Sequence, residues 1–330
     1  MQPFSYERST SVPDAVTRGA ASGAAFVAGG TTLVDLMKLN VQTPSTLVDI
    51  NHLPLDAIET QADGSIRVGA MVRNSVLAHD PRIVDGYPAL SQAILSGASV
   101  QLRNLATTGG NLLQRTRCFY FRDTVYPCNK RAPGSGCAAL DGFNRIHAIL
   151  GVSDACIATH PSDMAVALVA LDADVHVTGA GGERIVPITE FHLLPGDTPH
   201  DETVLAAGDL VTHVTLPPRR FAPASAYVKL RDRASFEFAL ASAAAALAFD
   251  GEVVIDARIA LGGVATKPWR AVAAERAIVG SPLRDDVVRA AADAALAGAR
   301  PRSHNRYKIE LAKRAIARAV QLAARARGQS

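Results

Sequence analysis

The sequence of 330 residues has little cysteine, few aromatic side chains and no long apolar run. It contains 4 cysteines and 1 tryptophan, and aromatic residues make up 5% of it. So few cysteines exclude a small secreted protein whose fold is held together by disulfides. The most apolar stretch, residues 236–249, is mostly alanine and is shorter than the roughly 18 residues that a membrane span needs. We therefore read it as buried structure and expect no membrane span.

The chain also lacks a strong charge of either sign. Its formal net charge is +3, and its lysines and arginines are scattered rather than clustered. This pattern argues against a nucleic-acid partner. The N-terminus has neither the basic start nor the apolar segment of a signal peptide. The sequence by itself predicts a cytoplasmic protein. Co-export with a signal-bearing partner subunit would place it in the periplasm without a signal peptide in this sequence.

What is there is an alternation of short strands and helices. Residues 1–60 have the pattern of a small α/β unit, and residues 61–218 have that of a second, larger one. Pro217-Pro218, followed by Arg219-Arg220, predicts a domain boundary because proline stops a strand. Residues 222–330 then predict a C-terminal unit of antiparallel strands that ends in a long amphipathic helix.

Two loops are rich in glycine and threonine. Gly29-Gly30-Thr31-Thr32 comes between an apolar strand and a helix, and Thr107-Thr108-Gly109-Gly110-Asn111 follows a predicted helix. Glycine lets backbone amides approach a ligand, and a helix N-terminus offers unpaired amides to an anion, so both loops suit a pyrophosphate. One such loop alone is better explained as a plain strand-to-helix turn, and neither is the G-x-G-x-x-G fingerprint of a Rossmann site. Two of them in one chain favour a shared dinucleotide.

Asp163 follows Pro161-Ser162 at the start of a predicted helix. An acidic residue in the first turn stabilises the helix dipole. The same carboxylate is able to accept hydrogen bonds from a ribose or from the hydroxyls of a cofactor linker. The residues alone leave both roles open.

All four cysteines lie in one short part of the chain, at Cys118, Cys128, Cys137 and Cys156. No C-x-x-C is present, so the spacing alone is a weak metal signal, and buried inert thiols or a zinc site are alternatives. Four cysteines also match the ligand set of a [4Fe-4S] cluster. Basic residues near the first two cysteines favour thiolates, and the local prolines and glycines let amides point at sulfurs. These basic residues are Arg115, Arg117, Arg122, Lys130 and Arg131.

Several short motifs occur in a fixed order along the chain. They are VAGGTTL at 27–33, RNLATTGGNL at 103–112, PSD at 161–163, YVKLR at 227–231 and ALGGVATKP at 260–268. Together they resemble the FAD-binding subunits of the xanthine dehydrogenase, or molybdenum hydroxylase, family over nearly the whole chain. The resemblance implies an α+β fold. It comprises an FAD-binding domain of the vanillyl-alcohol-oxidase (PCMH) type in two α/β subdomains, and a small C-terminal domain with a three-stranded sheet and helices.

The resemblance also implies which residues hold the cofactor. The first loop would bind the FAD pyrophosphate, the second would line the other side, and Asp163 would lie near the ribityl or phosphate part. Lys229 would approach the isoalloxazine and stabilise negative charge on the reduced flavin, whereas its alternative role is a solvated cation at a strand end. The residues implied in this way are Phe26, Val27, Ala28, Gly29, Gly30, Thr31, Thr32, Leu33, Thr107, Thr108, Gly110, Asn111, Asp163 and Lys229.

The cysteine segment, at about residues 115–157, resembles an insertion found in the aldehyde-oxidoreductase branch of that family, whose bacterial periplasmic members hold a [4Fe-4S] cluster in the FAD subunit. The stretches RCFYFRD at 117–123, CNKR at 128–131 and NRIHAIL at 144–150 carry this resemblance. It implies that all four cysteines ligate such a cluster. His147, which lies among them in the sequence, is expected to pack beside the ligands rather than to ligate.

The implied role is an electron-transfer subunit of a heterotrimeric, molybdenum-dependent aldehyde oxidoreductase. The molybdenum cofactor would lie on a large molybdopterin-binding subunit and [2Fe-2S] clusters on a small subunit, and no catalytic acid or base is assigned to this chain. The external electron acceptor is left open among NAD, ferredoxin, quinone and oxygen. Two rivals are a free-standing FAD oxidoreductase, which the 5% aromatic content supports poorly, and a zinc-stabilised binding protein.

Overall fold

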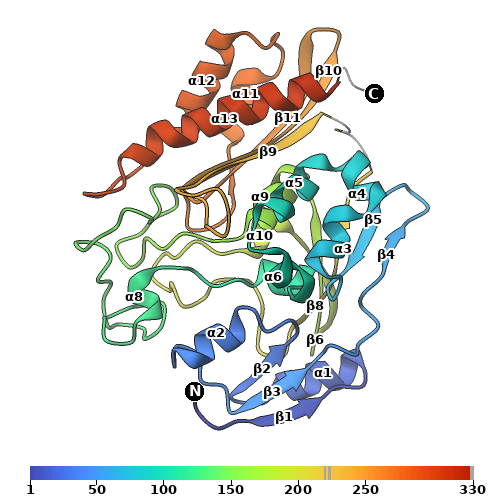
Figure 1. Ribbon diagram of the computed structural model, residues 1–330, viewed down its shortest axis with the longest axis vertical. Coiled ribbons are helices and arrows are strands. Elements are labelled where there is room, and N and C mark those ends of the chain that lie inside the picture. The colour runs from blue at the N-terminus through green and yellow to red at the C-terminus, as the bar shows by residue number, and fades with distance from the viewer. Residues whose placement is uncertain (219–220, 222–223, 328–330) are drawn as a thin grey trace.

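A computed structural model describes residues 1–218, 221 and 224–327. The basic pair Arg219-Arg220, which we predicted at a domain boundary, lies outside these residues. The described residues form three β-sheets that follow one another along the long axis of the molecule (Figure 1). Among them, no helix is long and apolar enough to cross a membrane.

The first sheet is parallel and lies at the N-terminal end of the molecule. Its strand order is β1-β3-β2, so the third strand of the chain is inserted between the first two. Helix α1 begins after Ser11, whose hydroxyl accepts from the amide of Asp14 and so caps it. The elements are β1 (Ser5–Arg8), α1 (Val12–Gly19), β2 (Ala24–Val27), α2 (Leu33–Lys38) and β3 (Thr46–Asp49).

The second sheet is antiparallel, with the strand order β4-β5-β8-β6-β7. Along β6 buried and half-buried residues alternate, as expected for a strand with one face on a core. The strands are β4 (Ile58–Thr60), β5 (Ile66–Gly69), β6 (Asp174–Gly179), β7 (Gly182–Pro187) and β8 (Leu210–Leu216).

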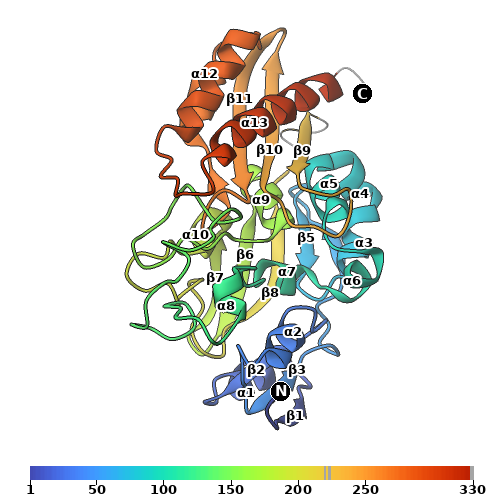
Figure 2. The same ribbon diagram turned by 60° about the vertical axis from the view of Figure 1, so that its left-hand side comes forward.

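Helices α5 and α9 of the second unit pack against the C-terminal unit, as Figure 2 shows. Every residue of α9 is buried, and together with α5 it forms the centre of the main core. The helices are α3 (Asn74–His79), α4 (Pro81–Gly86), α5 (Pro88–Ser96), α6 (Val100–Leu105), α7 (Thr108–Leu112), α9 (Asp163–Ala170) and α10 (Ile188–Phe191).

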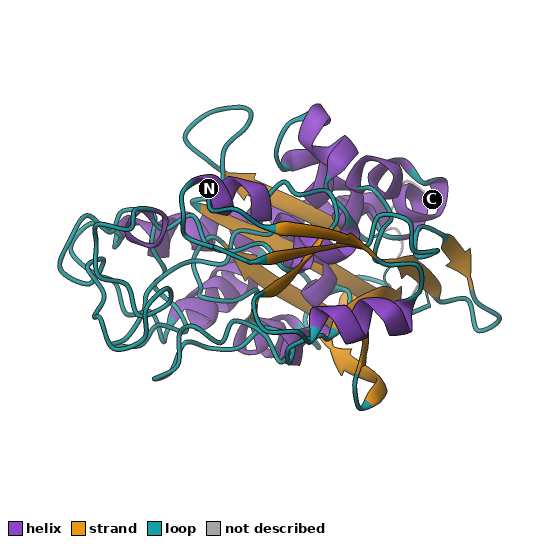
Figure 3. Cartoon of the chain, turned by 90° about the horizontal axis from the view of Figure 1, so that it is seen from below, coloured by secondary structure: helices purple, strands orange, loops and turns teal. Residues whose placement is uncertain are grey.

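The cysteine segment is almost entirely irregular. Its helix α8 (Phe119–Arg122) is one turn long, and the surrounding loops form the left side of the molecule in Figure 3. This agrees with the proline and glycine content of the segment.

The C-terminal unit, from β9 to α13, is an antiparallel sheet covered by helices. We predicted three strands; the structure adds β12, a two-residue strand at the edge, in the order β12-β11-β10-β9. The α+β fold class is confirmed. The elements are β9 (Ser225–Leu230), β10 (Ala241–Asp250), β11 (Val253–Gly262), β12 (Trp269–Arg270), α11 (Val272–Ile278), α12 (Asp285–Leu296) and α13 (Tyr307–Ala326).

Candidate functional site: a dinucleotide groove and a buried cysteine cluster

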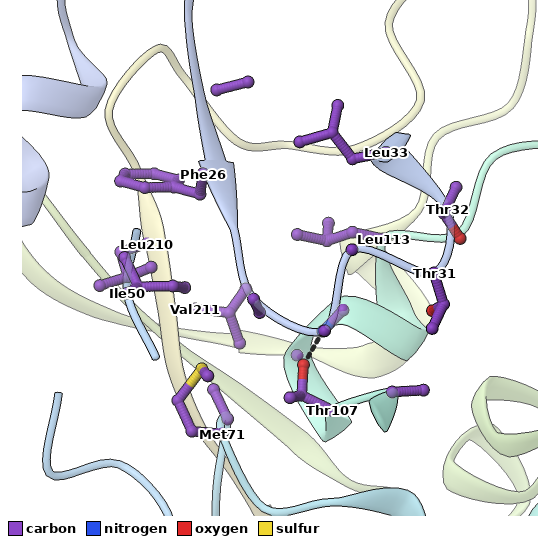
Figure 4. A pocket seen from close by; sticks show the side chains of 18 of the residues that line it. Phe26, Thr31, Thr32, Leu33, Ile50, Met71, Thr107, Leu113, Leu210 and Val211 are labelled. Carbon is purple, nitrogen blue, oxygen red and sulfur yellow. Dashed lines mark hydrogen bonds between the residues drawn. The ribbon is translucent and has the colours of Figure 1, made fainter. Parts of the chain in front are cut away.

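The first glycine loop connects β2 to α2, as the sequence predicts. Within the described residues, the amides of Gly30, Thr31 and Thr32 donate to no carbonyl group. Thr32 precedes α2 without capping it through its side chain, so its hydroxyl is also available. In Figure 4 Thr31 and Thr32 lie at the rim of a cavity whose wall includes Phe26. The loop therefore presents hydrogen-bond donors to this cavity.

The two glycine loops contact each other, although they are far apart in the sequence. A Cβ atom on Gly29 would lie 2.0 Å from the carbonyl oxygen of Leu105, which is backbone and cannot move aside. Only glycine therefore allows the first loop to pack against the segment that leads into the second loop.

The second loop uses its threonine hydroxyls to hold its own shape. Thr107 caps α7 by accepting from the amide of Gly110 at 3.2 Å, the dashed bond in Figure 4. The buried Thr108 hydroxyl donates to the carbonyl of Val72 at 3.1 Å. Asn111 accepts from the hydroxyl of Ser162, the cap of α9, at 2.6 Å. The loop is thus fixed to the segment that follows β5 on one side and to α9 on the other.

Two cavities, of about 220 Å³ and 280 Å³, lie along these loops. Four residues line both of them, namely Thr31, Thr32, Ala106 and Gly110, so the cavities meet between the loops and form one elongated groove. A groove with two arms suits a ligand with two large ends joined by a phosphate linker.

Asp163 and Lys229 meet in the second cavity, across the junction with the C-terminal unit. The Lys229 ammonium lies 2.7 Å from the Asp163 carboxylate, and both side chains are buried. Lys229 also donates to the carbonyl of Ser96 at 3.2 Å, and the Tyr227 hydroxyl donates to Asp163. Burial and the Asp163 charge raise the pKa of Tyr227 well above its usual value. Asp163 lies in the first turn of α9 and also lines the groove, so its contact with a cofactor stays a prediction.

Twelve of the fourteen predicted FAD residues line the groove. Val27 and Thr108 do not line it. Val27 ends β2, where it pairs with Asp49 of β3, and the Thr108 hydroxyl is bonded to the carbonyl of Val72. The sequence did not point to several other lining residues that belong to no glycine motif; they include Asn74, Gln114, Arg233 and Phe236.

The four cysteines come together in one buried cluster, although up to 38 positions separate them in the chain. Cys128 and Cys137 face each other across a short antiparallel bridge. Burial raises the pKa of the Cys118 thiol to about 12 and that of Cys156 to about 11, and the other cysteines add to both shifts. The Cys118 and Cys156 thiols are therefore protonated at neutral pH in the protein alone, and a bound cation would be needed to make them thiolates.

Backbone amides surround three of these sulfurs. The amide of Ala158 donates to the sulfur of Cys156 at 3.4 Å. Backbone groups at Tyr120 and Phe121 act to lower the pKa of Cys118, and those at Ala139, Leu140 and Ile157 act to lower the pKa of Cys137, against the larger effect of burial. Amides that point at sulfur fit the irregular backbone that we predicted for this segment. They stabilise negative charge on cysteine ligands.

Most basic residues of the segment pair with carboxylates. Arg117 and Arg122 pair with Asp35 of α2 at 2.9 and 2.7 Å. Arg115 and Lys130 pair with Glu202. Lys130 lowers the pKa of Cys156, but burial outweighs it. The expectation that these cations favour thiolates therefore holds for Lys130 at Cys156, while carboxylates from distant parts of the chain pair with four of the five cations.

Among the described residues, no three His, Cys, Asp or Glu side chains converge closely enough to bind a single metal ion. Zinc bound by four thiolates needs all of its sulfurs within about 2.3 Å of one ion.

Comparisons with known proteins identify the class to which this groove belongs. Residues 2–219 match the family described as the FAD binding domain in molybdopterin dehydrogenase, and residues 225–323 match the CO dehydrogenase flavoprotein C-terminal domain. The chain therefore belongs to the FAD-binding medium subunits of the molybdenum hydroxylase family and is an oxidoreductase subunit.

Individual relatives place it more narrowly. It is 52% identical to the aldehyde oxidoreductase FAD-binding subunit PaoB of Escherichia coli K12, over 96% of this chain and 97% of that protein. It is 28% identical to the glyceraldehyde dehydrogenase medium chain of Sulfolobus acidocaldarius, over 94% of each chain. The solved carbon monoxide dehydrogenase of Hydrogenophaga pseudoflava superposes with a TM-score of 0.77 at 28% identity and covers 98% of each chain.

Proposed function

We propose that this chain is the FAD- and [4Fe-4S]-containing electron-transfer subunit of a heterotrimeric, molybdenum-dependent aldehyde oxidoreductase. The observation that carries the proposal is a buried cluster of four cysteines beside a dinucleotide groove. Arg117 connects the two sites, because it precedes Cys118 in the chain and lines the groove. The 52% identity to an aldehyde oxidoreductase FAD-binding subunit supports the aldehyde class of substrate.

FAD fits the groove through the residues of both loops. The free amides and hydroxyls of Gly30, Thr31 and Thr32 would hold the pyrophosphate, while Asn111 and Gly110 line the opposite wall. When bound, FAD supplies the capacity to accept and release electrons one or two at a time. The chain's part is to hold and orient it and to exclude water around it.

Lys229 would tune the flavin less strongly than a free ammonium. Lys229 and Asp163 lie 2.7 Å apart, so their opposite charges largely cancel at a distance. A group in the second cavity therefore interacts strongly only with whichever of the two charges lies nearer to it. We propose that both residues face the cofactor and that the pair keeps the ammonium in place.

The cysteine cluster fits an iron–sulfur cluster better than it fits a single ion. In a four-iron cluster each thiolate binds its own iron, so the sulfurs need not converge on one point. The amides at Cys118, Cys137 and Cys156 would then offset the negative charge of the bound cluster. All four cysteines are proposed ligands.

The relatives are named as subunits or medium chains, which favours a subunit over a free-standing flavoenzyme. We propose that the partners are a large molybdopterin-binding subunit and a small [2Fe-2S] subunit, and that an external acceptor takes up the electrons. We also propose that the chain divides into FAD subdomains at residues 1–60 and 61–218 and a C-terminal domain at residues 222–330.

Metal and flavin analysis of the purified complex tests the proposal. The native complex should contain one FAD and four iron atoms in this subunit beyond those of its partners, and no zinc. The Cys128→Ser variant should lose this iron and keep most of its FAD, because Cys128 does not line the groove. Val125→Ser is the matched control, since Val125 lies in the same segment and its side chain is 85% exposed.

Two results would contradict the proposal. Iron content that stays unchanged in Cys128→Ser would remove the ligand assignment. Zinc in place of iron, with no flavin bands in the visible spectrum, would remove both cofactors.

A further inference from the structure

A short stretch of the cysteine segment is bound to the C-terminal unit through its backbone. Five consecutive carbonyl groups, those of residues 145–149, each accept a hydrogen bond from residues 300–308. The donors, in carbonyl order, are the Tyr307 hydroxyl at 3.1 Å, the Lys308 ammonium at 2.7 Å, the Asn305 side-chain amide at 3.3 and 3.1 Å, and the Arg300 amide at 2.7 Å. Such dense anchoring fixes the position of the side chain at its centre, which is His147.

His147 points at a cysteine. Its Nε2 atom lies 3.1 Å from the sulfur of Cys118, and the imidazole is almost fully buried. Its Nδ1 atom is also buried and has no hydrogen-bond partner among the described residues. A sulfur that binds iron has no proton to give, and an unpaired buried N–H is costly. The proton of the ring therefore belongs on Nε2, where it has an acceptor.

Lys308 places an amino group behind this contact, and burial lowers its pKa to about 7. It is fully buried, and its ammonium donates 2.7 Å hydrogen bonds to the carbonyls of Ile146 and Gly263. Within the part of the chain that the structure describes, no carboxylate pairs with it. A buried ammonium without a carboxylate is unfavourable unless negative charge lies nearby. A cluster bound by four thiolates would supply that negative charge near Lys308, because Lys308 bonds to the carbonyl of Ile146, the residue before His147.

We propose that His147 donates a hydrogen bond from Nε2 to the ligand sulfur of Cys118 and thereby raises the reduction potential of the iron–sulfur cluster, and that Asn305 and Lys308 of the C-terminal unit hold it there. This inference rests on the proposed [4Fe-4S] assignment. Reduction adds one electron and no proton to the cluster. A donor at the sulfur stabilises the more negative, reduced state, because hydrogen bonds to cluster sulfurs are among the determinants of potential. His147 is thus a positioning residue and not a ligand.

The test is an EPR-monitored redox titration of the cluster in the purified complex, with iron and FAD measured in parallel. We expect His147→Leu, which has no donor, to make the cluster about tenfold harder to reduce, a fall of about 59 mV for one electron. His147→Gln keeps an N–H donor and should restore part of the potential. Lys308→Met should shift it in the same direction as His147→Leu. His304→Leu is the matched control, because this exposed histidine lies in the same stretch, residues 300–308. Among the described residues its ring hydrogen-bonds only to Ser303.

A second measurement needs no variant and keeps the test independent of folding. When the wild-type complex is labelled with ¹⁵N-histidine, pulsed EPR of the reduced cluster should detect a weak nitrogen coupling and an exchangeable proton. No coupling, or an unchanged potential in an iron-loaded His147→Leu complex, would overturn the inference. A strong coupling typical of direct ligation would overturn it too. A wild-type complex without iron in this subunit would instead overturn the proposed function itself.

Discussion

At the scale of single residues, the contact between Lys229 and Asp163 connects cofactor binding to the architecture. The two side chains come from β9 and from the first turn of α9, and both are nearly inaccessible to solvent. Tyr227, two residues before Lys229 on the same strand, donates to the same carboxylate. A buried ion pair of this kind contributes little net stability as a whole, but the loss of one partner leaves an unpaired buried charge.

We therefore expect Lys229→Met to lower the free energy of unfolding by roughly 3–5 kcal/mol and to weaken FAD binding. Lys313→Met is the control, because Lys313 pairs with Asp293 at the same 2.7 Å but on the surface of α13. An exposed pair contributes at most about 1 kcal/mol. Urea unfolding of both variants measures the difference. Equal losses in the two variants would show that burial of the Lys229 pair does not matter.

At the scale of elements, α7 depends on a histidine from the end of α10. The ring of His192 lies 2.9 Å, at Nε2, from the carbonyl of Leu112, the last residue of α7. Since the carbonyl can only accept, Nε2 carries the proton. The ring packs edge-on against His160 and Phe191. Burial lowers the pKa of His192 to about 4. The second cofactor loop is therefore supported by a neutral, buried imidazole.

Acid should weaken this support. The folded pKa of about 4 lies below the ordinary value of 6.5. Between these values the unfolded chain binds a proton that the folded chain does not, so the contribution is complete above pH 6.5 and is lost as the pH falls through 4. The loss amounts to roughly 3 kcal/mol for a fully buried group. Urea unfolding at pH 7, 5.5 and 4.5 should show this decline.

His192→Gln keeps an N–H donor for Leu112 but does not titrate, so its stability should fall less steeply with acid. His52→Gln, at an exposed position, should follow the wild-type curve. A wild-type slope in His192→Gln would assign the acid sensitivity to other groups.

At the scale of the whole molecule, the main core extends across the junction between the second and C-terminal units. It includes α5 and α9 on one side and Tyr227, Ala244, Ala246 and Ala260 of the C-terminal sheet on the other. The core of the C-terminal unit in turn includes Ile149 and Leu150 from the end of the cysteine segment. These units are therefore expected to unfold together rather than one after the other.

A buried residue of α9 provides the test. Leu168→Ala creates a cavity in the main core, where Leu168 is 2% exposed, and should cost about 2–5 kcal/mol. Trp269, the one tryptophan of the sequence, lies in β12 of the C-terminal unit. Its fluorescence and the far-UV circular dichroism should shift to lower urea by the same amount. A fluorescence transition that stays at its wild-type midpoint would show that the C-terminal unit unfolds separately.

Much of the fold follows from local sequence. The strand and helix around Gly29-Gly30, the helix after Ser162 and the antiparallel strands of the C-terminal unit form where they are predicted. Turn residues, caps and apolar periodicity act over a few positions, so they can be read along the chain. The nearness of the four cysteines in sequence likewise predicted a common site. The recognisable motifs identified the family before any packing was known.

The tertiary structure alone decided which charges meet. Lys229 is 66 positions from Asp163, Arg117 is 82 from Asp35, and Lys308 is 162 from the carbonyl of Ile146. No local pattern encodes such pairs, because they depend on how whole elements pack. For this reason the sequence by itself determined the two glycine loops, the cysteine segment and the order in which strands and helices follow one another along the chain. Packing decided that the basic residues neutralise distant carboxylates, that Asp163 and Lys229 share one groove, and that the C-terminal unit holds His147 against Cys118.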